Sequence, residues 1–163
     1  MCMLTKQTKP EVAKKPIRCY KTVNTAFDGH GCPRYFRSTY YRFYYGLGKT
    51  YDTIEWEKRV SFGAEHEPVP DSNGDVVISY GFHSFGRVKD AFNEIVDRGT
   101  EVVLMCEIPE GARYFTGNRY YFDNSDPNYR EYCSEQIKVV AWRRKGIGET
   151  WHYAMQEEEK PCA

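Results

Sequence analysis

The chain has 163 residues, of which 40% are hydrophobic and 28% are charged, and its formal net charge is zero. This length and composition suit one globular domain and exclude collagen-like and largely disordered chains. No stretch approaches the roughly 18 consecutive apolar residues of a membrane-spanning helix, so we expect no membrane segment and a cytoplasmic protein.

The charges are unevenly spread along the sequence. Residues 1–45 hold nine Lys/Arg and two Asp/Glu, and residues 46–163 hold the other 14 Lys/Arg and 21 Asp/Glu. A basic front end could contact a phosphate backbone or an acidic protein face, and it could equally be a solvated arm. Nucleic acid is a possible partner but not the favoured one, because the whole chain is neutral.

Six cysteines are scattered without CxxC spacing, and the first residues hold no apolar leader, which predicts reduced thiols. The fragment His30-Gly31-Cys32 offers two potential metal ligands, and a zinc site needs more. We therefore expect no metal and no cofactor.

The first segments in chain order are an arm and a strand. Residues 1–16 lack periodicity and predict a disordered basic arm. Residues 17–23 (IRCYKTV) predict a strand with Arg18 and Lys21 off the apolar face, which is formed by Ile17, Cys19 and Val23.

An aromatic segment, YFRSTYYRFYY, follows at residues 35–45. Eight of its eleven residues are Tyr, Phe or Thr, which favour strands. One interpretation is a core strand with tyrosine hydroxyls at the rim. The other is an aromatic platform flanked by arginines, as single-stranded nucleic acid prefers. The candidate binding residues are Tyr35, Arg37, Tyr41, Arg42 and Tyr44.

Residues 49–56 alternate well enough to pair with this segment. A long polar loop at 63–75 then precedes a short apolar strand at 76–80, and loops of this length are often functional. The strand runs into GFHSF, where His83 could bond a backbone group or form a pocket wall.

Residues 85–98 predict one amphipathic helix, with Ser84 as its N-cap and Gly99 after its end. Its apolar stripe is Val88, Ala91, Phe92, Ile95 and Val96.

The rest of the chain predicts further strands. Residues 101–109 indicate a central strand covered on both faces, residues 113–133 several short strands, and residues 136–142 an alternating strand. One more short strand and an acidic tail at 154–163 complete the chain. The sum is an α+β domain over 17–153, with a mostly antiparallel sheet of seven to eight short strands and one helix.

No phosphate-binding loop, metalloprotease motif or nucleophile elbow is present. If the chain is an enzyme, the candidate catalytic residues are Tyr20, His83, Ser84 and Glu135.

Two resemblances arise from the order of CYKTV, YGLGKTY, GFHSF, EVVLMCEIPEGARYFTG and YCSEQIKVV. This set resembles a loose group of small phage and bacterial proteins with a GFH segment before a helix and an IPxGxxYxxG…YxSxxIxV ending. The likeness covers about residues 17–142. It implies a shared fold and a mobile-element setting, and no catalytic activity.

A fainter likeness is to ADP-ribosyltransferase-type domains. That likeness implies NAD as cofactor, with Tyr20 or Arg18 on the first strand, Ser84 on a middle strand and Glu135 or Glu131 on a late strand. The chain lacks a clean first-strand motif of that family. The paired acids of its arginine-modifying members are also missing.

The sequence therefore predicts a small binding protein, encoded by a phage or mobile element, that binds a host protein or a small ligand in the cytosol. The alternatives are an NAD-dependent transferase or a degenerate relative, and a protein that binds single-stranded nucleic acid.

Overall fold

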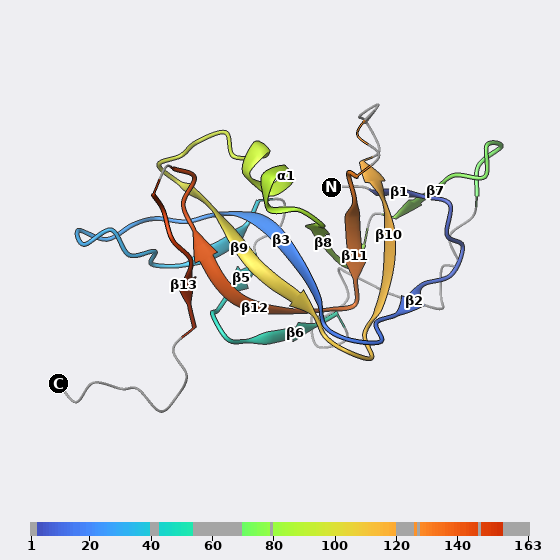
Figure 1. The fold of residues 1–163 in the computed structure, drawn as a ribbon, viewed down its shortest axis with the longest axis horizontal. Coiled ribbons are helices and arrows are strands. Elements are labelled where there is room, and N and C mark those ends of the chain that lie inside the picture. Colours follow the sequence, from blue (N-terminus) through green and yellow to red (C-terminus); the bar gives the residue numbers. More distant parts are fainter. Residues whose placement is uncertain are drawn as a thin grey trace.

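The computed structural model describes residues 3–39, 43–53, 70–78, 80–119, 126, 128–146 and 148–154. Within these ranges the backbone forms thirteen strands and one helix, and every strand pair is antiparallel (Figure 1). This confirms the predicted α+β class, with more strands than the seven or eight expected.

The elements are, in chain order, β1 (Met3–Thr5), β2 (Glu11–Val12), β3 (Ile17–Asn24), β4 (Phe36–Ser38), β5 (Tyr44–Tyr45), β6 (Thr50–Asp52), β7 (Val76–Ile78), β8 (Phe82–Phe85), α1 (Val88–Asn93), β9 (Glu101–Ile108), β10 (Arg113–Arg119), β11 (Glu131–Ser134), β12 (Gln136–Arg143) and β13 (His152–Tyr153).

Strand β9 forms the centre of the sheet, between β3 and β12. It pairs with β3 along its whole length, from Ile17 opposite Ile108 to Asn24 opposite Glu101. Seven of its eight residues are buried, as expected for an apolar run covered on both faces. β9 therefore lies in the hydrophobic core, with β3 and β12 paired on its two sides.

On the side of β3 that faces away from β9, the sheet divides into two branches. Tyr20 pairs with Phe85 of β8, whereas Val23 pairs with Ser38 of β4. From β8 the sheet continues through β11, β10, β1 and β7, while β4 continues into β5. In Figure 1, β8 lies between β3 and β11, below α1. Lys21 stands between the two contacts, and we call this place the β3 split.

The helix is shorter than the predicted range 85–98, because strand pairing claims its first residues. Phe85 belongs to β8 and pairs with Glu131 of β11. Ser84 is a strand residue too, so its prediction as N-cap is wrong. Arg87 occupies that position, without a side-chain cap.

The helix also ends earlier than predicted at its C-terminal end, because a carboxylate binds the backbone N–H groups beyond it. Glu101 Oε2 accepts hydrogen bonds from the backbone N–H groups of Val96 and Asp97, at 2.7 and 2.8 Å. Val96 is 93% exposed, so it is not part of an apolar stripe. The contacts of Glu101 with the backbone four and five residues before it thus override the helical pattern.

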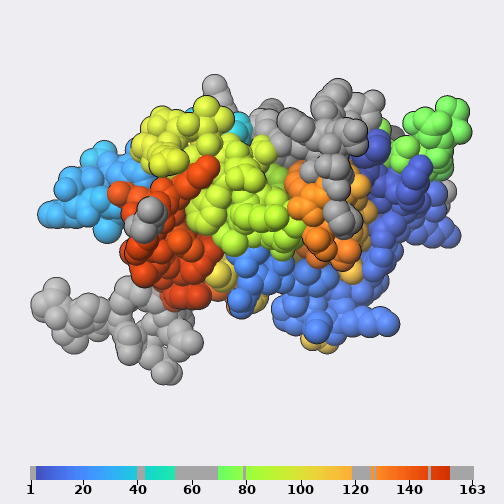
Figure 2. Space-filling view, turned by 45° about the horizontal axis from the view of Figure 1, so that its top comes forward, coloured from blue at the N-terminus to red at the C-terminus, as the bar shows by residue number. Residues whose placement is uncertain are grey.

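The segment 1–16, predicted as a disordered arm, contains two strands that join the sheet. β1 lies between β10 and β7, where Met3 pairs with Arg119 and with Ile78. Met3 is fully buried beside Phe115 and Cys133. Figure 2 shows the blue N-terminal residues against the orange β10 and β11. One apolar residue gives no periodicity, and distant strands supply its burial.

No helix of the described residues is long and apolar enough to cross a membrane. Cys19, Cys106 and Cys133 are buried free thiols, and Cys32 is an exposed one.

Candidate functional site

The β4–β5 hairpin divides the aromatic segment between the core and the surface. Phe36 and Tyr45 pair with each other and are buried, each with 6% of its surface exposed. Their strand neighbours point outward because successive strand side chains alternate between faces. We call the three outward residues, Tyr35, Arg37 and Tyr44, the hairpin outer face.

The two tyrosines of this face contact each other. The rings of Tyr35 and Tyr44 lie 5.8 Å apart and nearly perpendicular, at 80°. They remain 38% and 56% exposed. Arg37 pairs directly with Tyr44 across the hairpin and is also exposed. Three of the five candidate binding residues therefore share one surface.

Tyr41 and Arg42 lie outside the described residues, as does most of the predicted 63–75 loop, of which the structure describes 70–75. Beneath the hairpin, Phe43 packs edge to face on Tyr45 and Tyr51, at 4.7 and 5.0 Å between ring centres. The outer face thus stands on a packed aromatic cluster.

A second candidate site is a cavity of about 40 Å³ at the β3 split. If the β3–β8 pairing continued past Tyr20 and Phe85, the next pairs would be Lys21 with Ser84 and then Thr22 with His83. The strands separate there instead. The cavity is lined by Lys21, Thr22, Ser38, Thr39, His83, Phe85, Glu94 and Glu101.

Lys21 is half-buried and lines this cavity. Its Nζ donates a hydrogen bond to the His83 carbonyl oxygen at 2.6 Å and lies 5.9 Å from the centre of the Tyr45 ring. Burial lowers the pKa of Lys21, because desolvation disfavours the charged form. Among the described residues no ion pair includes Lys21.

His83 is 6% exposed, and neither ring nitrogen has a hydrogen-bonding partner in the described part of the chain. Burial, followed by the nearby Lys21 charge, lowers the pKa of His83 to about 3, while the backbone of Tyr80, which lies near the ring without forming a regular hydrogen bond, opposes the shift. The ring is therefore neutral at pH 7, with one donor and one acceptor available. Buried polar atoms without partners are rare and call for an explanation.

Of the candidate catalytic residues, the structure brings His83 alone to this cavity. Tyr20 packs on Trp151, on the other face of β3 from Lys21. Ser84 alternates with His83 and is buried beside the Cys19 thiol.

Glu135 lies apart from these residues and is held by an arginine. Its two carboxylate oxygens accept hydrogen bonds from Arg113 Nε, at 2.7 Å, and from the Arg113 backbone N–H, at 2.8 Å. The four candidates therefore do not surround one cavity.

Lys21 is a cavity residue that no sequence motif indicates. The prediction that it lies off the apolar face of its strand is wrong, because alternation puts it on the same face as Cys19 and Val23. A lysine at such a position was the available signal. Cys133, which lies directly opposite His83 on β11, had no such signal, because the β8–β11 register is set far along the chain.

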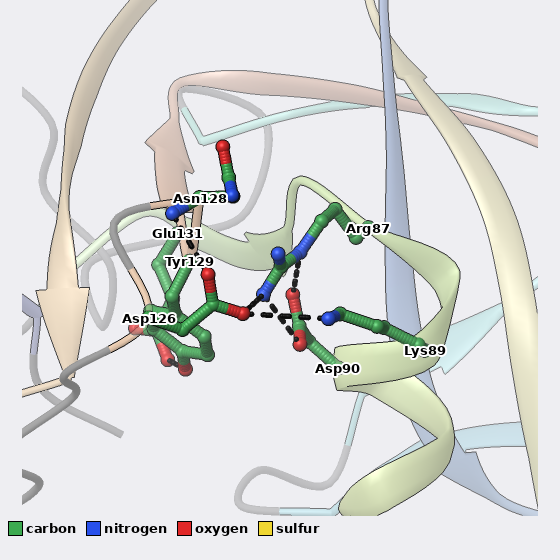
Figure 3. A network of polar contacts seen from close by, with 7 residues as sticks. All are labelled: Arg87, Lys89, Asp90, Asp126, Asn128, Tyr129 and Glu131. Atoms are coloured by element: carbon green, nitrogen blue, oxygen red, sulfur yellow. Dashed lines mark hydrogen bonds and ion pairs between the residues drawn. The ribbon is translucent and has the colours of Figure 1, made fainter.

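The alternative carboxylate, Glu131, is fully buried on β11 and accepts a hydrogen bond from the Tyr129 hydroxyl. A network of ion pairs holds the segment before β11, which includes Asp126, against α1 (Figure 3). Arg87 bonds Asp90 at 2.7 Å and Asp126 at 2.9 Å. The network thereby fixes the chain that leads into β11.

A larger groove of about 550 Å³ runs along β1, β10 and β11. Several of its polar groups are already paired, as in the Lys6–Asp75 ion pair at 2.9 Å and the Tyr114–Glu11 hydrogen bond at 2.9 Å. None of the candidate residues lines it.

Within the described ranges no group of three or more His, Cys, Asp or Glu side chains could hold a metal ion. No known protein family, curated protein or solved structure matches the chain.

Proposed function

We propose that the chain is a binding protein and that the hairpin outer face is its contact surface. The observation that carries this proposal is the exposure of Tyr35, directly before β4, and of Tyr44 on β5, 38% and 56%, beside strand residues that are buried. The two rings already contact each other, so less side-chain freedom is lost on binding than for isolated tyrosines.

The chemistry of this face is that of an interface centre. Tyrosine and arginine are enriched among the residues that contribute most to protein–protein binding. Arg37 is exposed and forms no ion pair with any described residue, so its charge is available to a partner. The neighbouring Arg34 is exposed as well.

The partner that fits this face is a protein with an acidic surface patch. The excess of basic residues in 1–45 would speed its association at low salt. The resemblance to phage and bacterial proteins makes a bacterial lysate the first source in which to seek it.

The test compares capture by the immobilised wild-type chain with capture by Arg37→Ala/Tyr44→Ala. We expect a specific protein that the double variant retains at least about tenfold less, as the loss of two central interface residues predicts. Tyr153→Ala is the matched control, because Tyr153 is 60% exposed on β13. Equal capture by all three chains would overturn the proposal.

Single-stranded nucleic acid is a second candidate, because the same three residues supply aromatic rings beside an arginine. An oligonucleotide retained by the wild-type chain in low salt, lost at high salt and lost in Arg37→Ala would favour it. Salt-insensitive or absent retention would remove it. The transferase alternative has no comparable support, since Tyr20, Ser84 and Glu135 lie apart from the cavity.

A further inference from the structure

We propose that the cavity at the β3 split is a binding site for a small oxyanion, the carboxylate or phosphate group of a ligand, held by Lys21 and His83. This site is separate from the hairpin outer face and does not depend on the function proposed for that face.

Unused hydrogen-bonding groups of opposite strands meet at the cavity. Lys21 uses one of its three N–H groups for the His83 carbonyl oxygen, and both ring nitrogens of His83 lack partners among the described residues. His83 is nine-tenths buried and forms a wall of the cavity together with Lys21. These donors come from β3 and β8, so an occupant would join the strands where their backbones separate.

The charge of Lys21 selects an anion. A half-buried ammonium without an ion pair is unfavourable, and a negatively charged oxygen would compensate it. Glu131 raises the pKa of Lys21 through its charge, and it is the weakest of the causes that act on that pKa. Lys21 therefore retains most of its need for a counter-charge.

The carboxylates that line the cavity do not meet this need. Glu101 directs Oε2 to two backbone N–H groups beyond α1, and no ion pair joins Glu101 or Glu94 to Lys21. Their negative charges do restrict the site, because they repel an anion. An anion must therefore approach from the side of the cavity formed by Lys21 and His83.

The size of the cavity limits what can enter. A volume of 40 Å³ has room for about three water molecules. That space suits one carboxylate or phosphate group rather than a whole nucleotide. Phe85 forms an apolar wall that excludes water from one side and strengthens the remaining electrostatic contacts.

The test is thermal unfolding in acetate, in inorganic phosphate and in ribose, each against chloride at equal ionic strength. We expect one of the two anions to raise Tm by roughly 5–10 °C at about 100 times its Kd. Lys21→Met should abolish the shift, whereas Lys138→Met, which changes an exposed strand lysine, should retain it. An equal shift in Lys21→Met, or a shift with ribose and neither anion, would overturn the proposal.

A second measurement needs no variant. Titration of the wild-type chain with the same anions, followed by NMR of the Lys21 Nζ and the His83 ring nitrogens, should show saturable changes at both. Unchanged resonances would refute the proposal even if Lys21→Met failed to fold. The Arg37→Ala chain should bind the anion normally, so failure at this site is distinguishable from failure at the hairpin.

Discussion

Lys21 donates a 2.6 Å hydrogen bond to the carbonyl oxygen of His83 at the place where β3 and β8 stop pairing. The Lys21 side chain thus supplies a hydrogen bond between β3 and β8 where their backbones no longer pair. This arrangement comes with a half-buried ammonium and a histidine ring without partners among the described residues, both of which influence stability.

The first prediction concerns Lys21→Met, which keeps the length of the side chain and removes its charge. The folded pKa of Lys21 lies below its unfolded value of about 10.4. Between the two pKa values the unfolded chain binds more protons, so the wild-type free energy of unfolding gains from rising pH.

The variant lacks that gain, so the difference between the two chains should change with pH up to about 10.4 and then level off. Urea unfolding of both chains from neutral to alkaline pH measures it. A pH-independent difference would contradict the prediction.

The second prediction concerns the protonation of His83. With its pKa lowered to about 3, the folded ring should stay neutral at pH 5, while in the urea-unfolded chain it titrates near its ordinary value of about 6.5. Its contribution to stability is present above about pH 6.5 and is lost as the pH falls through 3. Ring nitrogen shifts in the folded and unfolded chains test this, and a folded ring that titrates near 6 would refute it.

The third prediction concerns the seating of β1 on β10. A Cβ at Gly117 would lie 2.2 Å from the Leu4 carbonyl oxygen and 2.9 Å from Met3 Cγ, so Gly117→Ala should displace β1. We expect a loss of about 1–3 kcal/mol in the free energy of unfolding and faster amide exchange in β1.

The control for this change is Gly29→Ala, where a Cβ meets nothing within 4 Å. Full stability and slow exchange in Gly117→Ala would mean that β1 does not lie where the structure places it.

The fourth prediction concerns the ion network between α1 and the segment before β11. Arg87→Ala leaves Asp90, which is 7% exposed, without its partner, and should lower the free energy of unfolding by about 1–3 kcal/mol. Lys89→Ala removes a 3.3 Å contact from a side chain that is 61% exposed, and should change stability little. Chemical denaturation separates the two, and equal effects would contradict the assigned roles.

Acid should weaken the same network. Hydrogen bonds from Arg87 and from the Asn128 backbone N–H hold the pKa of Asp126 below its usual value. Its contribution is therefore present above about pH 3.9 and is lost as the pH falls. Asp126→Asn should remove that acid-dependent component.

Local alternation predicted part of this structure and could have predicted more. The central strand at 101–109 follows from an apolar run, and the division of Tyr44 and Tyr45 between surface and core follows from parity. Strict parity also places Lys21 on the buried face of its strand. The charge of Lys21, taken alone, favours the opposite, solvent-facing side.

Other features depend on contacts that no local pattern contains. The helix pattern at 85–98 is real in spacing, but Phe85 is claimed by Glu131 across a strand pair, and Glu101 draws the chain out of the helix. The environment of His83 likewise depends on the register with Cys133. Long-range pairing decides such positions, and a single sequence does not reveal it.

The place of β1 in the sheet bears on how the chain folds as it is made. Thr5 donates a side-chain hydrogen bond to the carbonyl oxygen of Thr116, 111 residues later. At a synthesis rate of about 5–20 residues per second, β1 waits roughly 6–22 s on the ribosome for β10. During that interval β1 can pair with β7, but neither strand is joined to the rest of the sheet until β10 is made. Assembly of this end of the sheet is therefore a late step, open to chaperones and to pairing with other nascent chains.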